Sequence, residues 1–164
     1  MKWTEAEMKI HREMMSRAIE LAEKGMKKGD GGPFGAVVAR DGKIIGEGWN
    51  RVLGTNDPTA HAEVVAIRNA CKHLDSFQLE ECILYTSCEP CPMCLGAIYW
   101  ARPKQFFYGC KREDAAEIDF DDDFIYREID LSPDERSIPA FNLQREEALK
   151  VFEAWRVLEQ KTPY

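Results

Sequence analysis

Residues 82–109 read CILYTSCEPCPMCLGAIYWARPKQFFYG, and this stretch decides the fold. Its first residues, 82–86, are of strand type, and a helix is expected to follow the cysteines and to run through Trp100. That helix should end before Pro103, because the residue ahead of a proline disfavours helical conformation. Residues 105–109 again predict a strand. Two strands joined by a helix indicate a parallel pair, since parallel neighbours need a crossover connection.

The chain before this stretch predicts a long helix and then a β-hairpin. Thr4-Glu5-Ala6-Glu7 has the form of a capping box, and apolar residues recur behind it on one helical face, so a helix is expected over 5–28. Asp41-Gly42 is a two-residue hairpin signal between strand-type residues at 36–39 and 43–46. The hairpin would supply two antiparallel strands.

A second helix is expected from about 60 to 73, after a turn-rich stretch at 53–58. The order is then helix, hairpin, helix, strand, helix and strand. Because parallel strands need helical connections that cover the faces of the sheet, this order predicts the α/β class. We expect a three-layer α/β/α sandwich with a mixed sheet.

The C-terminal third differs in character from the rest of the chain. It has an acidic stretch at 114–123, a helix-start pattern at 132–135 and an amphipathic pattern at 146–160. It contains no repeat and no low-complexity linker. We expect a single domain over 1–164, with 111–164 as a C-terminal appendage.

Composition and charge limit the classes of function. With 164 residues, 45% of them hydrophobic, the chain can bury a core. A net charge of -7 and a pI near 5.1 argue against a polyanion as the main partner, because phosphate contacts need clustered Lys and Arg. No apolar stretch approaches the ~20 residues that span a bilayer, and residues 1–10 do not form a secretion signal. A small-molecule substrate, without nucleic acid or membrane, is expected.

Three of the six cysteines fall within 88–94, a spacing suited to a metal in a reducing compartment, so a cytoplasmic location is expected. Cys91 and Cys94 lie three apart at a helix start, where both sulfurs can reach one ion and the positive helix end favours thiolates. His61, also near a helix start, can supply a third ligand. Three protein ligands leave the fourth tetrahedral position open for water, which is typical of a catalytic zinc site.

Glu63 is the candidate catalytic residue, two positions after His61. Zinc-bound water becomes a nucleophile near pH ~7, but expelling an amino group still requires a group that carries protons. The pattern H-x-E followed by P-C-x-x-C resembles the signature of the zinc nucleobase deaminases. An alternative from another class stays open: a closed structural zinc site, with Cys88 or His73 as fourth ligand, in a module that binds another protein.

Residues 33–109 resemble the cytidine deaminase-like superfamily, and a closer resemblance, to the bacterial guanine deaminases, extends over most of the chain. The residues that carry it are Asn56–Glu63, Leu84–Arg102, Phe120–Asp122 and Tyr164. This resemblance implies hydrolytic deamination of guanine to xanthine and ammonia. It also implies one zinc ion per chain, bound by His61, Cys91 and Cys94, with Glu63 as the proton shuttle.

Four further residues are implied to bind the purine base. Asn50 corresponds to the base-binding asparagine of the superfamily, and Phe34 and Trp100 are placed to sandwich a flat ring. The backbone amide of Ala62 is expected to contact the base as well. These positions would also suit ordinary turn or core residues.

The resemblance to the guanine deaminases makes Asp122 the candidate for recognising guanine itself. Guanine presents N1–H and its 2-amino group as adjacent donors, and a carboxylate is an acceptor-only group that can accept from both. Three neighbours compete for this role, namely Asp119, Asp121 and Asp123.

The resemblance implies a homodimer in which C-terminal segments are exchanged between subunits and Tyr164 closes over the active site of the neighbour. An aromatic ring with a hydroxyl can exclude water and form a hydrogen bond. Other substrates stay open as alternatives: guanosine, cytosine, or an adenosine in tRNA, although the acidic charge and Tyr99-Trp100 speak against tRNA.

Overall fold

The computed structural model describes residues 3–120 and 122–163. The chain divides into two units, within residues 1–122 and 123–164. The first unit therefore includes Asp122 and the short helix α5 (Arg112–Ala116).

The first unit contains a mixed sheet with the strand order β2-β1-β3-β4. β1 pairs antiparallel with both β2 and β3, whereas β3 and β4 are parallel. The strands are β1 (Gly35–Arg40), β2 (Lys43–Trp49), β3 (Ile83–Cys88) and β4 (Gln105–Cys110). The hairpin turn has positive φ at Asp41 and Gly42, 50° and 72°, as a two-residue turn of this kind requires. The predicted mixed sheet is confirmed.

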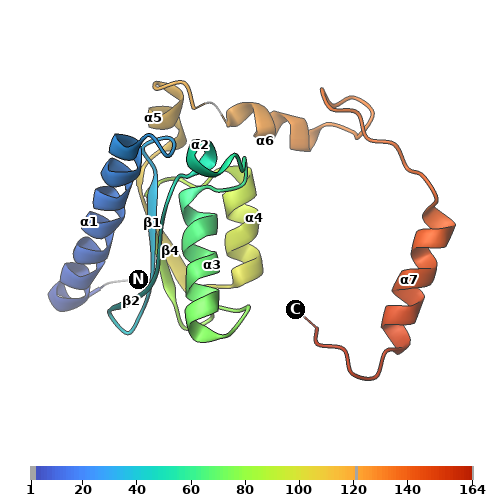
Figure 1. Cartoon of the computed structure of the whole chain (residues 1–164), viewed down its shortest axis with the longest axis horizontal. Helices are drawn as coiled ribbons and strands as arrows, with labels where there is room; N and C mark the ends of the chain where they lie inside the picture. Colours follow the sequence, from blue (N-terminus) through green and yellow to red (C-terminus); the bar gives the residue numbers. More distant parts are fainter. Residues whose placement is uncertain (1–2, 121, 164) are drawn as a thin grey trace. The chain divides into compact units, whose positions relative to one another are not determined.

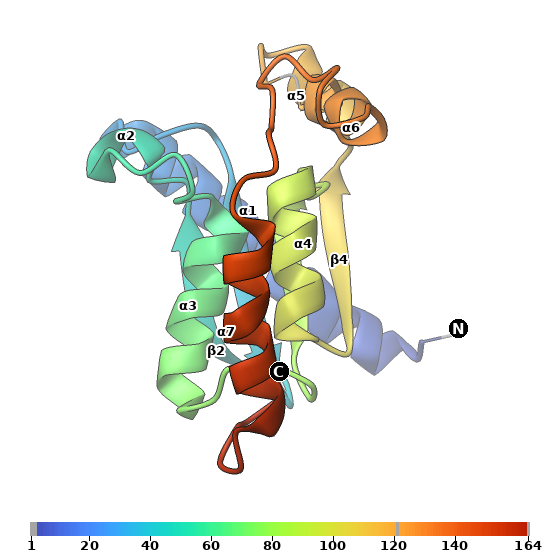
Figure 2. The same ribbon diagram turned by 90° about the vertical axis from the view of Figure 1, so that its right-hand side faces the viewer.

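Helices cover both faces of this sheet (Figures 1 and 2). α1 (Glu5–Lys28) packs on one face, and α3 (Ala62–Leu74) and α4 (Pro92–Ala101) pack side by side on the other. Successive side chains of β1 alternate between two cores: Ala36 and Val38 face α3 and α4, while Val37 and Ala39 face α1. The predicted three-layer α/β/α sandwich is confirmed.

α1 has the bounds that its sequence predicts. Thr4 accepts a hydrogen bond from the backbone N–H of Glu7, and the Glu7 carboxylate accepts one from the backbone of Thr4, which completes the capping box. Gly29 ends the helix in the left-handed region, with φ 72°. Local chemistry therefore fixes both ends of α1.

Two local expectations were wrong. The turn-rich stretch contains a short helix, α2 (Val52–Thr55). The helix-start pattern at 132–135 begins no helix, because these residues form turns instead. Ser137 donates from both its backbone N–H and its hydroxyl to Glu128, at 2.7 Å each, and so ties the turn back to the preceding helix.

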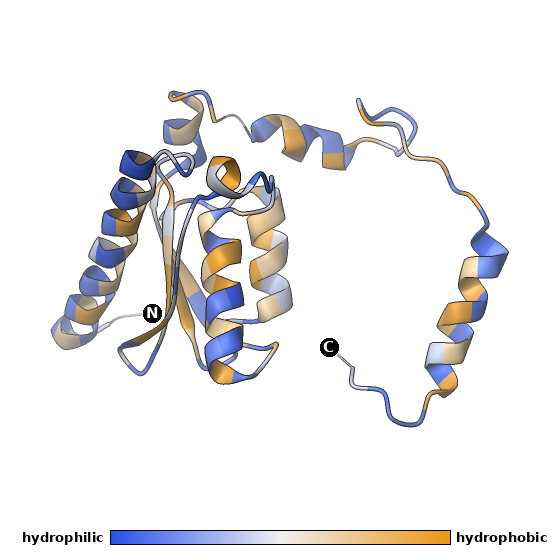
Figure 3. Ribbon diagram, viewed as in Figure 1, coloured by the Kyte–Doolittle hydropathy of each residue, from blue (hydrophilic) through white to orange (hydrophobic). Residues whose placement is uncertain are grey.

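The second unit contains two helices, α6 (Asp123–Asp130) and α7 (Arg145–Val157), with no buried residue in either. Val151, Phe152 and Trp155 of α7 follow helical spacing and are exposed, Phe152 to 70%. Figure 3 shows hydrophobic residues recurring along this helix. Within the part of the chain that the structure describes, no helix is long and apolar enough to cross a bilayer.

The topology gathers several segments at one edge of the sheet. Because β1 runs antiparallel to its two neighbours, its beginning lies beside their ends: Gly35 pairs with Trp49, and Ala36 pairs with Thr86. The chain then continues from β3 directly into α4. Phe34, Asn50 and the cysteine motif are thereby placed at a common edge, outside the carboxyl end of β3, where open α/β sheets bind ligands.

Candidate active site

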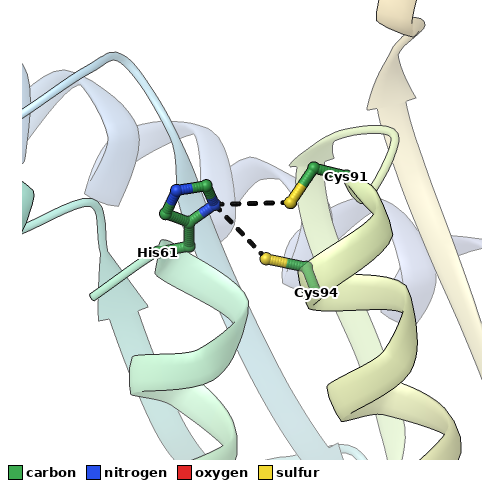
Figure 4. A group of neighbouring side chains, drawn as sticks. All are labelled: His61, Cys91 and Cys94. Atoms are coloured by element: carbon green, nitrogen blue, oxygen red, sulfur yellow. Dashed lines mark hydrogen bonds between the residues drawn. The ribbon is translucent and has the colours of Figure 1, made fainter. Parts of the chain in front are cut away.

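His61, Cys91 and Cys94 form one cluster at this edge (Figure 4). His61 precedes the first residue of α3 and Cys91 precedes the first residue of α4, each with extended backbone. Cys94 lies one turn inside α4 and is fully buried. The histidine Nδ1 lies 3.5 Å from each of the two sulfurs. Two helix starts therefore bring together the three ligands that the sequence predicts.

The cluster has the dimensions of a zinc site. Tetrahedral bonds of about 2.3 Å to sulfur and 2.0–2.1 Å to nitrogen place sulfur and nitrogen about 3.5 Å apart. That agrees with the observed 3.5 Å between the histidine nitrogen and each sulfur, and all three ligand atoms lie within 4.8 Å of one another. Two thiols and an imidazole also have the ligand chemistry that zinc prefers. The residues fit this ion.

The electrostatics favour a thiolate in the cluster. The hydrogen bond from the Cys94 thiol, followed by that from His61, lowers the pKa of Cys91 to about 4. Conversely, the hydrogen bond to Cys91 raises the pKa of His61, and the negative charges of Glu63 and Asp122 raise it further. The hydrogen-bonded pair of thiols beside His61 therefore favours a thiolate, which prepares the cluster to bind a cation.

Glu63 lies on the first turn of α3 and is only 6% exposed. Burial raises the pKa of its carboxyl group, while a hydrogen bond with Cys94 acts in the opposite direction. The hydroxyl of Thr86, on β3, donates to Oε1 of Glu63 at 3.2 Å. The catalytic candidate thus contacts the metal cluster and is also tied to the central part of the sheet.

Thr86 is a site residue that sequence reasoning missed. The signal that could have found it is a hydroxyl on the inward face of β3. Leu84, two residues earlier on the same face, packs into the core beneath α3 and α4. A polar group at such a position needs a hydrogen-bond partner.

α3 lies close against β2, and this contact sets the position of its first turn. A Cβ atom on Gly48 would lie 2.5 Å from the carbonyl oxygen of Ala62, and one on Gly46 would lie 2.5 Å from that of Ala66. Larger residues on β2 would push the helix away from the sheet. The two glycines therefore hold the start of α3, with His61 and Glu63, at its present depth.

Cys88 and His73, the alternative fourth ligands, lie outside the cluster. The Cys88 thiol contacts the carbonyl oxygen of Lys111 at 3.6 Å, and burial raises its pKa to about 12. His73 lies twelve positions after His61, near the far end of α3, about 18 Å along the helix axis. Among the described residues the cluster has three members, as an open catalytic site requires.

Phe34, Asn50 and Ala62 are close to this cluster in the fold. Asn50 is buried, and its backbone N–H donates to the carbonyl oxygen of Phe34 at 2.9 Å. Its Oδ1 accepts from the N–H of Val52 at 3.2 Å, which orients the side-chain amide. Ala62 is the first residue of α3, where backbone N–H groups have no partner within the helix. Asn50 and Phe34 are therefore bound to each other at the edge of the sheet, and Ala62 follows the ligand His61 directly.

Asp122 is half-buried, and its charge contributes to raising the pKa of both His61 and Cys88, which places it beside the cluster. Asp119 is exposed, and Asp123 begins α6, where it pairs with Arg127 at 3.6 Å. Asp121 lies outside the described residues. Of the described candidates, Asp122 is the one whose charge reaches His61.

Trp100 is not brought to the cluster within its own chain. It lies nine positions after Cys91 near the end of α4, about 13 Å along the helix axis, and is 66% exposed. Tyr164 lies outside the described residues.

Comparisons with known proteins agree with the geometry. Residues 8–110 match the family model described as the cytidine and deoxycytidylate deaminase zinc-binding region. The guanine deaminase of Bacillus subtilis is 58% identical over 154 residues, which cover 94% of this chain and 99% of that protein. The X-ray structure of that guanine deaminase superposes with a TM-score of 0.91 and covers 94% of this chain and 98% of the other.

Two other relatives cover a smaller part of the chain. A guanine deaminase structure from Nitrosomonas europaea is 34% identical, has a TM-score of 0.63, and covers 66% of this chain and 63% of the other. The tRNA-specific adenosine deaminase of Haemophilus influenzae is 46% identical over 97 residues, which cover 58% of this chain and 56% of that protein. The similarity to the Bacillus subtilis protein extends much further along the chain.

Proposed function

Because the chain belongs to the family of deaminases with the cytidine and deoxycytidylate deaminase zinc-binding region, we propose that it converts guanine and water to xanthine and ammonia. The observation that carries the proposal is the three-member metal cluster with a buried carboxylate against it. The near full-length similarity to a guanine deaminase supports guanine as the base.

The roles proposed for the residues that bind the purine follow from the hydrogen-bonding groups of guanine. Asp122 is proposed to accept from N1–H and the 2-amino group, since its carboxylate lies beside the cluster and offers only acceptors. Asn50 presents a side-chain amide that is oriented by Val52, and the Ala62 N–H adds a donor. The ring of Phe34 provides a flat apolar surface. Trp100, near the end of α4, is proposed to contact a base bound to the partner subunit, and Tyr164 is assigned the same role by the family resemblance.

The catalytic steps are assigned to Glu63. When bound, zinc lowers the pKa of a coordinated water so that the water can act as a nucleophile at neutral pH. Glu63 accepts a proton as the water oxygen attacks C2 of guanine and passes this proton to ring nitrogen N3. It then accepts the second proton, from the new C2 hydroxyl, and transfers it to the amino nitrogen, which leaves as ammonia as the C2 carbonyl of xanthine forms. A buried carboxyl with a raised pKa suits a group that must both hold and release a proton.

Ammonia release from a substrate panel tests the proposed substrate. Guanine should be turned over much faster than cytosine, adenine or a tRNA hairpin, because these three lack the adjacent pair of donors that Asp122 requires. Guanosine has the same two donors, so its rate shows whether the site admits a ribose. Faster ammonia release from the tRNA hairpin would contradict guanine as the substrate and favour a tRNA adenosine deaminase.

Asp122→Asn is expected to impair guanine turnover while zinc content stays unchanged. The amide would present a donor, or a single acceptor, to two donors of the base, and a buried mismatch of this kind costs about 1–3 kcal/mol. This corresponds to a loss of about 5- to 150-fold in kcat/KM at 1.4 kcal/mol per tenfold. The matched controls are Asp119→Asn and Asp123→Asn. If one of these is the harmful change and Asp122→Asn is silent, the assignment is wrong.

We also propose that the protein is a homodimer whose second unit, 123–164, is an exchanged appendage. The support is that α6 and α7 bury no residue in this chain, although α7 carries an apolar stripe. Ile138, Phe141 and Leu143, in the segment before α7, are each at least 80% exposed. A second copy of the chain, offering its own exposed α4 residues Tyr99 and Trp100, is the proposed partner.

Deletion of Pro163 and Tyr164 tests the exchange. The truncated protein should keep its zinc and its unfolding midpoint but lose most guanine deamination. Mixed with Glu63→Gln protein it should regain activity, because a dimer of the two variants contains one site with both an intact Glu63 and an intact tail. If subunits of an equal mixture reassort at random, about half of the dimers are mixed and each has one complete site of two. Activity should therefore reach at most about a quarter of the wild-type value. Truncated enzyme with wild-type kinetics would contradict any role for the tail.

We also propose that the protein is cytoplasmic and acts in purine breakdown. All six cysteines are free thiols, including the exposed Cys110, as a reducing compartment allows.

A further inference from the structure

A buried hydroxyl and the buried carboxylate pair with each other beneath the active site. The described residues include four buried polar side chains, and two of them are Thr86, 1% exposed, and Glu63, 6% exposed. The Thr86 Oγ1 lies 3.2 Å from Glu63 Oε1. An ionised carboxylate only accepts hydrogen bonds, so the hydroxyl is the donor.

Thr86 is held more rigidly than most side chains near the site. Its strand, β3, is an interior strand, and Thr86 is paired with Ala36 on one side and Tyr108 on the other. Its side chain points toward α3 and α4, because Leu84 two residues earlier does so. A β-branched residue also has restricted χ1 rotamers. The direction of the hydroxyl is therefore fixed by the sheet.

We infer that Thr86 is a positioning residue that fixes the rotation of the Glu63 carboxyl group. With Oε1 engaged by the hydroxyl, the other oxygen, Oε2, carries the proton between water, ring nitrogen and leaving amine. When that oxygen is protonated, Oε1 still accepts from the hydroxyl, so the contact persists throughout the reaction. This inference rests on the proposed role of Glu63 and extends it by one residue.

Without the Thr86 hydroxyl, nothing would fix the terminal torsion of the Glu63 side chain. The terminal torsion of a glutamate is broad and roughly two-fold, so packing alone does not select one carboxyl orientation. A displacement of about 1 Å in a reacting group can lower the rate about 10²-fold. The effect should appear in kcat, since the Thr86 hydroxyl contacts the proposed proton shuttle.

Two substitutions separate the hydroxyl from the shape of the side chain. Thr86→Val keeps the shape and removes the hydroxyl, whereas Thr86→Ser keeps the hydroxyl and removes a methyl group. With zinc-loaded protein, Thr86→Val should lower kcat for guanine by about 10- to 100-fold with KM within about twofold. Thr86→Ser should regain most of that loss. If both variants lose kcat equally, or if the valine variant retains more than half of wild-type kcat, the inference fails.

A second measurement does not depend on activity. Thr86→Val should lower the urea midpoint of unfolding of the zinc-loaded protein, because it leaves a buried carboxylate without its donor. In a Glu63→Ala background the same change should lower the midpoint clearly less. Equal shifts in both backgrounds would show that the two side chains are not coupled. If wild-type protein does not act on guanine, the proposed function fails while this unfolding cycle still decides the Thr86 contact.

Discussion

Glu63→Gln protein is expected to bind zinc and fold like wild type but to lose nearly all turnover of guanine. The amide is close to isosteric with the carboxyl group and can still accept from Thr86, so the buried position stays filled and satisfied. It cannot carry a proton, and general acid–base help of this kind contributes about 10²–10⁴-fold. Initial rates of ammonia release, at equal zinc content, measure the loss.

The Glu63 result has a matched control on the opposite side of the molecule. Glu47 is a carboxylate of β2 that pairs with Arg17 at 2.6 Å, away from the cluster. Glu47→Gln should remove this ion pair yet leave guanine turnover essentially unchanged. More than about a tenth of wild-type activity in the Glu63→Gln protein would contradict the shuttle role, since at least about 10²-fold is assigned to it.

Cys91→Ala is expected to abolish stable zinc binding and all deaminase activity. Cys91 is one of the three ligands of the cluster, and its loss leaves only one sulfur and one imidazole. Loss of a residue that merely supports a ligand weakens metal binding about 10- to 100-fold, so loss of a ligand should weaken it further. Metal analysis after dialysis against a chelator measures bound zinc per chain.

Cys110→Ala is the control for Cys91→Ala, because it removes a thiol that is exposed and outside the cluster. It should retain zinc at wild-type stoichiometry. Undiminished zinc in the Cys91→Ala protein would contradict the ligand assignment.

The sequence predicts the first unit well because its signals are local. A capping box and a glycine fix α1, Asp41-Gly42 fixes the hairpin turn, and the proline at 103 follows α4 closely. Cys91 and Cys94 were predicted for a similar reason, because two cysteines three apart at a helix start are a short-range signal. His61 lies 30 positions from Cys91 and was predicted from its own place near a helix start and from the family motif. Helix and strand bounds elsewhere differ by only a few residues.

What the sequence could not predict depends on contacts between distant residues. The Thr86–Glu63 hydrogen bond joins residues 23 positions apart, and nothing local to Thr86 distinguishes it from an ordinary strand threonine. The pattern at 132–135 favoured a helix, but Glu128 binds Ser137 and holds this segment as turns. Cys110 follows apolar residues, a setting typical of core cysteines, yet it is exposed at the end of the edge strand β4.

Conversion of guanine in ¹⁸O-labelled water tests the central claim most directly. Zinc-loaded protein should form xanthine with one ¹⁸O atom, at C2, together with one equivalent of ammonia, because the attacking oxygen comes from water and the amino group leaves. Mass spectrometry of the base and an ammonia assay on the same sample give both quantities, with Glu63→Gln protein as the control. Guanine recovered unchanged, under conditions in which the protein deaminates another base of the panel, would contradict the account.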